Sequence, residues 1–226
     1  MCGIAGYLCS PGQTPEVSIL EGARKAMRHR GPDDSGLYFD KNHHLGLAHT
    51  RLAIIDLSTD GHQPMSCQSG KISLVFNGEI YNYKEIRGEL EATGVNFVGK
   101  SDTEVLLELY KKHRFKENVE TVLLRELNGI FAFAIWDVDK QSIFAARDAF
   151  GVKPFYYSIQ PQGFFFASEI RALNSLLLPQ KDENFKSFVT HGESFETTKI
   201  SLNVQAIDRY LTFLWCPGNL SPFNHI

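Results

Sequence analysis

The stretch Ile130-Phe131-Ala132-Phe133-Ala134-Ile135-Trp136 is one of the longest apolar runs of the chain and decides its fold class. Aromatic and β-branched residues favour a β-strand, and successive side chains of a strand point to opposite faces. A strand of this composition is therefore apolar on both faces. Sheets built from such strands must be covered on both sides, so we predict that they pack against each other and against helices.

The segments on either side of this run predict further strands and helices. Apolar segments rich in aromatic and β-branched residues predict strands at Gly3–Cys9, His44–Asp56, Lys71–Phe76, Ile130–Asp137, Ser142–Arg147, Pro154–Ile159 and Gly163–Ala167. Turn residues at Asp139-Lys140 and at Gln160-Pro161-Gln162-Gly163 predict antiparallel hairpins. Helical spacing of apolar residues appears in segments that include Val17, Val105, Val122 and Ile170. The fold class is therefore α+β, a four-layer αββα sandwich of two mostly antiparallel sheets.

Composition describes an ordinary globular chain and excludes several kinds of partner. The 226 residues are 43% hydrophobic and 22% charged, with a net charge of −3, which suits one large core plus an extension. Lys and Arg are scattered, so no nucleic-acid partner is expected. No apolar run approaches the roughly 18 residues of a membrane span. Four cysteines without a C-x-x-C pair, and no secretory leader pattern, predict reduced thiols in the cytoplasm.

Cys2 is the first residue with possible chemistry, because removal of Met1 would leave its thiol and a free α-amine on one residue. An α-amino group titrates near ~7.7–8.0, which suits a general base at neutral pH, and cysteine is an easily activated nucleophile. The alternative is that Cys2 is only a small buried hydrophobe at the start of a strand. The other segments must decide between the two.

Two further segments combine turn or strand character with charged residues. Arg28–Gly36 contains Gly-Pro-Asp-Asp, which by itself favours a solvated loop. His49–Asp56 contains Arg51 within a strand-like run. Such an arginine is often an edge residue whose stem lies along apolar surface, but on a rigid element it can also bind a carboxylate through two hydrogen bonds.

Asn77-Gly78-Glu79-Ile80-Tyr81-Asn82 follows a predicted strand and precedes a helical pattern that begins near Tyr83. Asn-Gly is typical of a hairpin turn, but no strand follows here. We expect the Gly78 N–H to be free at the strand end beside the Asn77 amide, where the two donors can form an oxyanion hole. Ser101-Asp102-Thr103-Glu104 has the pattern of a capping box at the start of a helix to about His113. Helix capping is enough to explain a serine at position 101 and a glutamate at position 104. Asp102 can in addition bind the ammonium group of a ligand.

These segments together resemble the glutaminase domain of class II glutamine amidotransferases, a branch of the N-terminal nucleophile hydrolases. Cys2-Gly3-Ile4, His29–Asp33, the Arg51 strand, Asn77–Asn82 and Ser101–Glu104 occur in the order of that family, and Ala146–Tyr157 is also similar to it. The resemblance covers residues 2–178. The His-Arg-Gly-Pro-Asp segment favours the asparagine synthetase type over related amidotransferases.

The resemblance implies hydrolysis of L-glutamine to L-glutamate and ammonia in an αββα sandwich. Cys2 is then the nucleophile that forms a γ-glutamyl thioester, its α-amine is the base, and Asn77 and Gly78 hold the oxyanion. Arg51 binds the substrate α-carboxylate, while Asp102 and Glu79 receive its α-ammonium group. The substrate-binding residues implied are Arg51, Leu52, Ala53, Ile54, Ile55, Asn77, Gly78, Glu79 and Asp102.

The resemblance also implies a partner for the ammonia. Asparagine synthetases of this type continue into a synthetase domain that uses ATP and Mg²⁺, whose Ser-Gly-Gly-x-Asp-Ser signature is absent from these 226 residues. We expect residues 179–200 to be a linker and residues 201–226 to begin that synthetase domain. The apolar stripe Ile207, Tyr210, Leu211 and Leu214 is then an uncovered interface, or alternatively core of a standalone protein. The expected partners are L-glutamine and a synthetase domain or subunit that receives ammonia, and a homodimer is a further expectation.

Two other functions remain open at this point. One is a catalytically silent domain that binds glutamine as a sensor or scaffold, and the other is an ammonia donor to a different acceptor. The eight histidines lack the spacing of a zinc site, and no Gly-rich phosphate loop is present. We therefore expect no metal and no cofactor for the glutaminase reaction.

Overall fold

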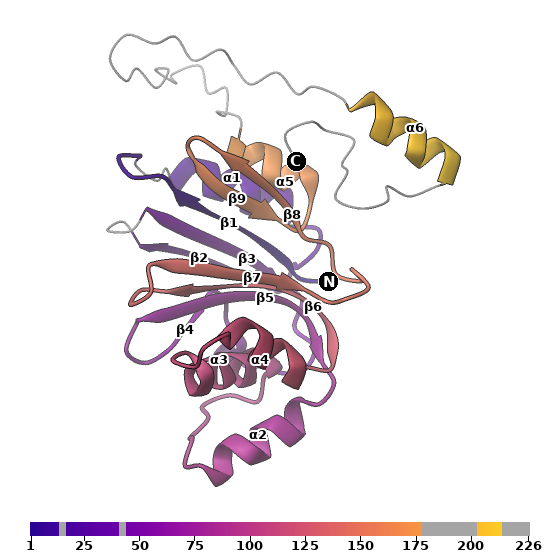
Figure 1. The fold of residues 1–226 in the computed structure, drawn as a ribbon. Coiled ribbons are helices and arrows are strands. Elements are labelled where there is room, and N and C mark those ends of the chain that lie inside the picture. Colours follow the sequence, from indigo (N-terminus) through magenta and orange to yellow (C-terminus); the bar gives the residue numbers. More distant parts are fainter. Residues whose placement is uncertain (14–16, 41–43, 178–202, 214–226) are drawn as a thin grey trace.

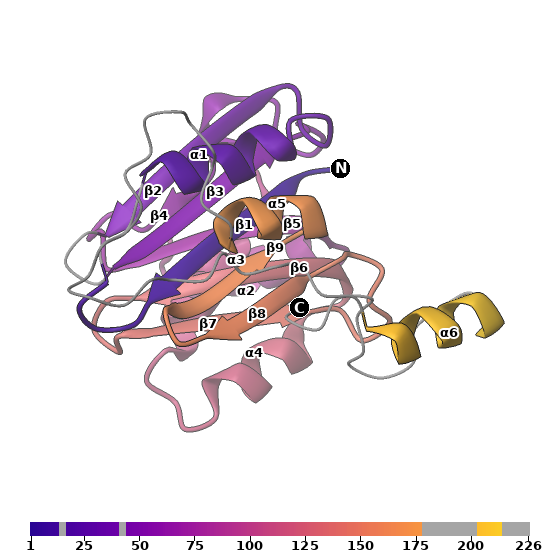
Figure 2. The same cartoon turned by 90° about the horizontal axis from the view of Figure 1, so that it is seen from above.

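The computed structural model describes residues 1–13, 17–40, 44–177 and 203–213. Its first sheet contains five strands in the order β2-β3-β1-β9-β8, all antiparallel to their neighbours. Their bounds are β1 Gly3–Cys9, β2 Asp34–Asp40, β3 Leu45–Arg51, β8 Tyr156–Gln160 and β9 Gly163–Ala167. Helices α1 (Val17–Ala26) and α5 (Ile170–Leu177) cover its outer face, side by side (Figure 2).

The second sheet contains four antiparallel strands in the order β4-β5-β6-β7. Their bounds are β4 Met65–Ser66, β5 Ile72–Ile80, β6 Gly129–Asp137 and β7 Ser142–Arg147. Helices α3 (Asp102–His113) and α4 (Val119–Glu126) pack on its outer face, and α2 (Tyr83–Ala92) packs against α3. A short 3-10 helix, η1 (Thr59–Gly61), precedes β4.

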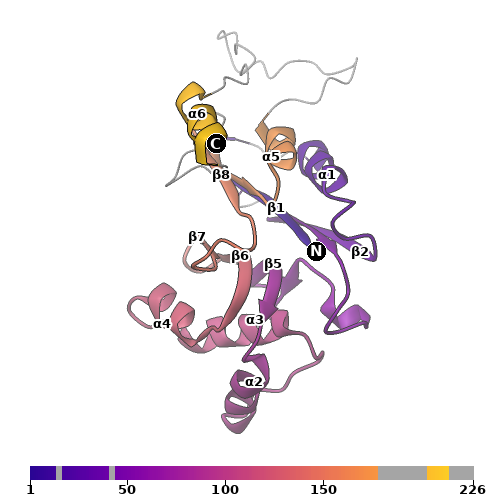
Figure 3. The ribbon, with the colours of Figure 1, turned by 90° about the vertical axis from the view of Figure 1, so that its right-hand side faces the viewer.

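Figure 1 shows the four layers stacked in the order helices, sheet, sheet, helices, and Figure 3 shows the same stack from the side. The two sheets face each other through a core to which both contribute, with Ile4, Leu47 and Phe166 from the first sheet and Val75 and Trp136 from the second. Ala132 and Ala134 of β6 join this core, whereas Phe131, Phe133 and Ile135 point to the helices beneath. The predicted αββα sandwich and its cause, a strand apolar on both faces, are thus confirmed.

Most predicted elements are present, and three boundaries were wrong. The predicted strand His44–Asp56 ends at Arg51, because from Leu52 onward the chain turns away from the sheet. The predicted strand Lys71–Phe76 continues to Ile80, so Asn77-Gly78 lies inside β5 and not at its end. The last part of the loop predicted at Arg28–Gly36 already belongs to β2, since Asp34 to Gly36 pair with β3.

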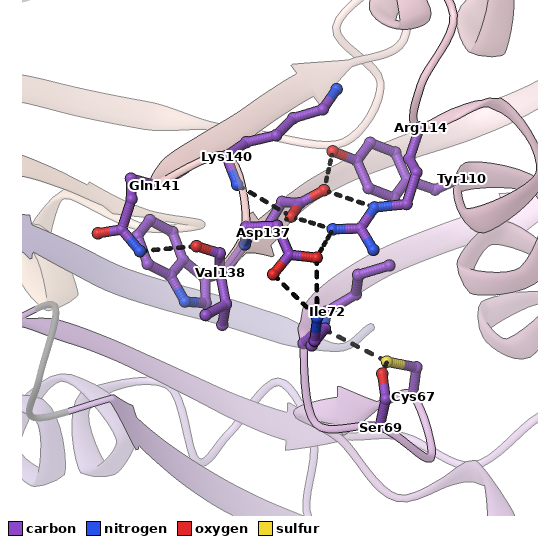
Figure 4. Close-up of polar contacts among 12 residues, drawn as sticks. Cys67, Ser69, Ile72, Tyr110, Arg114, Asp137, Val138, Lys140 and Gln141 are labelled. Atoms are coloured by element: carbon purple, nitrogen blue, oxygen red, sulfur yellow. Dashed lines mark hydrogen bonds and ion pairs between the residues drawn. The ribbon is translucent and has the colours of Figure 1, made fainter.

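A buried ion-pair cluster closes the far end of the second sheet, where Ile72 of β5 pairs with Asp137 of β6. Asp137 is fully buried and accepts hydrogen bonds from the Arg114 guanidinium and the Tyr110 hydroxyl, which both come from the end of α3 (Figure 4). It also accepts the backbone N–H of Asp139 and Lys140 in the β6–β7 turn. The cluster therefore ties helix, sheet and hairpin together away from the Asn77 end of β5.

The last described element is helix α6 (Val204–Phe213). Ala206 is fully buried, whereas Val204 is exposed. Ile207, Tyr210 and Leu211 of the predicted apolar stripe fall within this helix. The predicted linker at 179–200 lies outside the described residues, as do Leu214 and Trp215 and the side chains of Tyr210 and Leu211. The proposed domain boundaries therefore stay predictions.

Candidate active site

A cavity of about 170 Å³ lies where the N-terminus of β1 meets the Asn77 end of β5 and the start of α3. Of the residues expected at the site, those that line it are Cys2, Arg51, Leu52, Ile54, Ile55, Asn77, Gly78, Glu79 and Asp102. Ala53 does not line it, because its N–H donates instead to the Asp33 carboxylate at 2.9 Å. Segments far apart in the sequence are thus gathered into one pocket.

Cys2 lies just before β1, with its thiol against the backbone of Leu52. The Leu52 N–H donates to Sγ at 3.4 Å, and Sγ donates to the Leu52 carbonyl at 3.6 Å. Burial raises the pKa of the Cys2 thiol, and the Leu52 contact and the positive charges of the N-terminus and Arg51 oppose this rise. The Arg30 guanidinium donates to the Cys2 carbonyl at 2.9 Å and so holds its main chain. Met1 also lines the pocket, and in this chain it ties up the Cys2 nitrogen in a peptide bond.

The free edge of β5 explains why Gly78 can act as a donor although it lies within a strand. β4 pairs with Ser73 and Leu74, and in the ranges that the structure describes no strand pairs with this edge from Phe76 onward. Alternate residues of a strand point their N–H groups to the same edge. The Phe76 N–H is taken by the Gln63 side chain and the Ile80 N–H by Asp102, at 2.6 and 3.0 Å. The Gly78 N–H between them faces the pocket, which Gly78 lines.

Gly78 is required by its neighbours as well as by the pocket. A Cβ atom at this position would lie 2.3 Å from the Ile130 carbonyl oxygen and 2.7 Å from the Phe131 Cα atom of β6. Both are backbone atoms of the paired strand and cannot move aside. A side chain at position 78 would therefore push β5 and β6 apart at the pocket.

Asn77 supplies the second donor expected at the site. It is 1% exposed, and its side chain points to the face of β5 that Val75 also occupies, towards the first sheet. Its amide nitrogen Nδ2 has no hydrogen-bond partner among residues 1–13, 17–40, 44–177 and 203–213. A buried donor without a partner costs on the order of 1–3 kcal/mol, which favours a ligand acceptor at this point in the pocket.

Arg51, the last residue of β3, brings a buried cation to the pocket. Its guanidinium donates to the carbonyl oxygens of Asp56 and Ser58, at 2.8 Å for Ser58. The η1 turn packs on it, since a Cβ at Gly61 would collide with Nη2. In the described part of the chain no ion pair involves Arg51, and Asp56 directs its carboxylate to Ser58 and the Lys100 N–H. A cation with only neutral partners suits a ligand carboxylate.

Asp102 opens α3, as predicted, with Ser101 as N-cap. The Ser101 hydroxyl accepts the Glu104 N–H at 3.2 Å, whereas the Glu104 carboxylate binds the N–H groups of Val98 and Gly99 and does not complete a capping box. Burial raises the pKa of Asp102 to about 6, and the nearby charge of Glu79 acts in the same direction. A ligand ammonium group between the two carboxylates would offset both effects.

The pocket has lining residues that the sequence analysis missed. They are Asp56, Gly61, Gln63, Phe76, Ser101, Thr103 and Lys153. Gln63 and Thr103 are both buried and lie outside any pattern of apolar spacing, so no periodic signal marks them. Arg30 lies in the His29–Asp33 segment that the analysis had singled out, and its contact with Cys2 was not foreseen.

The described residues hold no group of three or more His, Cys, Asp or Glu side chains placed to bind a metal. The donors at the pocket include side-chain amides, backbone N–H groups and the cations Arg51 and Lys153, which suit an anionic or carbonyl oxygen. No helix in the described ranges has the length and apolar character needed to cross a membrane.

The fold is similar to solved structures of the same architecture. Glutamine phosphoribosylpyrophosphate amidotransferase from B. subtilis, solved with ADP and GMP, superimposes with a TM-score of 0.64 at 22% identity, covering 77% of this chain and 43% of that chain. At this identity the similarity concerns the fold alone, which agrees with the four-layer αββα sandwich.

Sequence comparison then identifies the family. A profile of the glutamine amidotransferase domain matches residues 1–207. The chain therefore belongs to the class II glutamine amidotransferase family, and the family predicted from its motifs is confirmed.

The curated relatives carry two kinds of name. Asparagine synthetase [glutamine-hydrolyzing] 3 of Bacillus subtilis is 42% identical over 176 residues, which cover 76% of this chain and 27% of that protein. Amidase chry2 of Gibberella zeae is 38% identical over 182 residues, which cover 76% of this chain and 26% of that protein. The chain thus spans about a quarter of the length of these relatives.

Proposed function

We propose that this chain hydrolyses L-glutamine to L-glutamate and ammonia through a thioester on Cys2. The observation that carries the proposal is the meeting of the Cys2 thiol, the unpartnered Asn77 amide and the Gly78 N–H in one pocket. A nucleophile and two oxyanion donors together are needed for acyl transfer, whereas a domain that only binds glutamine needs neither.

The first half of the reaction forms the thioester. After removal of Met1, the Cys2 α-amine takes the thiol proton while the sulfur attacks the side-chain carbonyl carbon of glutamine. The carbonyl π electrons move to its oxygen, where Asn77 and Gly78 donate hydrogen bonds. The oxyanion then collapses, the carbon–nitrogen bond breaks, and the protonated amine returns its proton to the leaving nitrogen, which departs as ammonia.

The second half regenerates the thiol. The α-amine removes a proton from water as the water oxygen attacks the thioester carbonyl, and the same two donors hold the second oxyanion. Collapse breaks the carbon–sulfur bond, the sulfur regains its proton, and glutamate leaves. Arg51 binds the α-carboxylate of the substrate, and Asp102 with Glu79 binds its α-ammonium group, so the side-chain amide is oriented towards Cys2.

The test is intact-mass analysis of the purified chain before and after incubation with a diazoketone analogue of glutamine, together with a glutaminase assay. We expect loss of Met1, one adduct on Cys2, and ammonia release that chelators do not reduce. The matched control is Cys9→Ala, a free cysteine outside the pocket, which should react like the parent. Reversible glutamine binding without an adduct would instead identify a sensor, and retention of Met1 without an adduct would exclude the reaction in this form.

We further propose that the ammonia passes to a synthetase domain or subunit that uses ATP and Mg²⁺ to make asparagine. Support comes from relatives named glutamine-hydrolysing asparagine synthetases. Glutamine labelled with ¹⁵N in its side-chain amide, incubated with the chain, the synthetase, aspartate and ATP, should give labelled asparagine. Label in a different product would redirect the proposal to another acceptor. We also propose a cytoplasmic location, in keeping with the free thiols, and a homodimer, which light scattering will test.

A further inference from the structure

Gln63, which lies between η1 and β4, connects two parts of the pocket that belong to different layers of the fold. It is 4% exposed and lines the cavity. Its side-chain oxygen accepts the Phe76 N–H of β5 at 2.6 Å, and its side-chain nitrogen donates to the Thr103 hydroxyl of α3 at 3.3 Å. Phe76 precedes the donor pair Asn77 and Gly78, and Thr103 follows Asp102. One side chain therefore joins the oxyanion donors to the ammonium-binding carboxylate.

The need for this connection follows from the free edge of β5. Beyond Leu74 no strand of the described residues pairs with this edge, so no ladder of backbone hydrogen bonds from these residues keeps it in place. Gln63 and Asp102 bind the N–H groups of Phe76 and Ile80, two residues to either side of Gly78. They replace the missing strand where the Gly78 N–H must keep its direction.

A second contact fixes the same segment from its carbonyl. His49 of β3 is fully buried, and its Nε2 lies 3.1 Å from the Phe76 carbonyl oxygen. A carbonyl oxygen only accepts, so Nε2 carries the proton. Burial lowers the pKa of His49 to about 3, so the ring is neutral at neutral pH and keeps this tautomer. Phe76 is thus held through both its N–H and its C=O, and the N–H contact depends on Gln63.

We infer that Gln63 is a positioning residue, which sets the direction of the Asn77 and Gly78 donors through Phe76 and the placement of Asp102 through Thr103. This inference rests on the proposed glutaminase function. The two contacts have different kinetic consequences. Oxyanion donors act mainly in the transition state and therefore determine kcat, whereas the ammonium contact is present in the bound substrate and therefore determines KM.

Substitution of Gln63 and Thr103 separates the two contacts. Gln63→Met keeps the length of the side chain and removes both hydrogen bonds, so we expect kcat to fall about 10- to 100-fold and KM for glutamine to rise. Thr103→Val removes only the link to α3 and should raise KM with little change in kcat. Thr103→Ser keeps the hydroxyl and should restore the parent values.

The control is His62→Gln, a change at the neighbouring residue that disturbs only the exposed contact with Asp34. It should keep the parent kcat and KM. Two further readouts distinguish positioning from general damage. The thermal midpoint should show that each variant is folded, and alkylation of Cys2 by iodoacetamide should keep the parent rate in all of them, because the nucleophile is not moved.

The results separate this inference from the function on which it rests. Parent turnover with unchanged kcat and KM in Gln63→Met would overturn the role of Gln63 alone. Equal losses in His62→Gln, or a matching loss of Cys2 alkylation in Gln63→Met, would also overturn it. A parent chain that loses Met1 but releases no ammonia from glutamine would overturn the proposed function and this role together.

Discussion

Arg51 and Asp102 place a cation and a carboxylate in the same pocket, and neither belongs to an ion pair among the described residues. Each has neutral hydrogen-bond partners that hold its position: carbonyl oxygens for Arg51 and the Ile80 N–H for Asp102. Burial of both charges lowers the free energy of unfolding, because the two groups do not form an ion pair with each other. At the residue scale, this pair of opposite charges supports the proposed binding of the α-carboxylate and α-ammonium groups of glutamine.

Asp102→Asn should make the free protein more stable at neutral pH while it weakens glutamine binding. Burial raises the pKa of Asp102 from 3.8 to about 6, so the folded protein holds this proton more tightly than the unfolded chain does. Ionisation of Asp102 therefore lowers stability as pH rises from about 4 to about 6, by on the order of 3 kcal/mol in total.

Thermal unfolding of Asp102→Asn and the parent across this pH range checks the prediction. The gain in Tm should shrink as pH falls towards about 4. Asp60→Asn, at an exposed position in η1, is the control and should leave Tm unchanged. In kinetics, kcat/KM of the parent should fall as Asp102 is protonated. A variant less stable than the parent at neutral pH would contradict the raised pKa.

Arg51→Lys should raise KM for glutamine about 10- to 100-fold with a small effect on kcat, because the carboxylate contact is similar in the ground and transition states. Lysine keeps the charge but lacks the planar pair of donors that can bind a carboxylate while holding two carbonyls. Steady-state kinetics measures both constants. Arg125→Lys, an exposed change on α4, is the control. A loss in kcat with KM unchanged would assign Arg51 to the chemical step instead.

At the scale of elements, buried carboxylates hold loops around the pocket. The Asp148 carboxylate accepts the N–H groups of Phe131, Phe150, Val152 and Lys153. Burial alone would raise the pKa of Asp148, but these backbone hydrogen bonds together lower it. The loop between β7 and β8, which brings Lys153 to the pocket, is thereby fixed to β6.

Asp148→Asn should lower the free energy of unfolding by about 1–3 kcal/mol, because an amide has only one acceptor oxygen for four N–H groups. The folded pKa of Asp148 is lowered, so its contribution is present above the ordinary carboxyl pKa and is lost as pH falls below it. Urea unfolding at neutral and acidic pH measures this. Glu89→Gln, at an exposed carboxylate on α2, is the control. Equal stability of Asp148→Asn and the parent at neutral pH would contradict the role of the carboxylate.

At the scale of the whole molecule, the site exists only because two sheets are stacked. Cys2 directly precedes β1 and Arg51 ends β3 of the first sheet, whereas Asn77, Gly78 and Glu79 belong to the second. The core between them, with Phe166 stacked on Phe155 at 5.2 Å between ring centroids, sets their separation. The inter-sheet core thus determines both stability and catalytic geometry.

Phe166→Ala should cost about 3–5 kcal/mol of stability, because the ring is fully buried between the sheets. In the variant that remains folded at low temperature, kcat should fall, because the nucleophile and the oxyanion donors are carried by the two sheets that this core joins. Denaturant unfolding and the glutaminase assay measure the two effects. Phe115→Ala, at a largely exposed ring, is the control, and it should change stability by less than about 0.5 kcal/mol.

Local sequence patterns determined the layered architecture, the start of α3 and several residues of the pocket. The alternation in Phe131–Ile135 required layers on both sides of a sheet, and Ser101-Asp102-Thr103-Glu104 placed a carboxylate at the start of α3, because both signals depend on near neighbours in the chain. The family motifs at Cys2, Arg51 and Asn77 identified residues that the fold brings into one pocket.

Tertiary structure alone decided the remainder. Asn77-Gly78 resembles a turn but lies in β5, because pairing with β6 continues to Ile80. Asp34-Ser35-Gly36 begins β2, because β3 lies beside it. Gln63 and Thr103 meet although 40 positions separate them. Hydrogen bonds between distant segments depend on how sheets and helices stack. Patterns among neighbouring residues in the sequence do not predict this stacking.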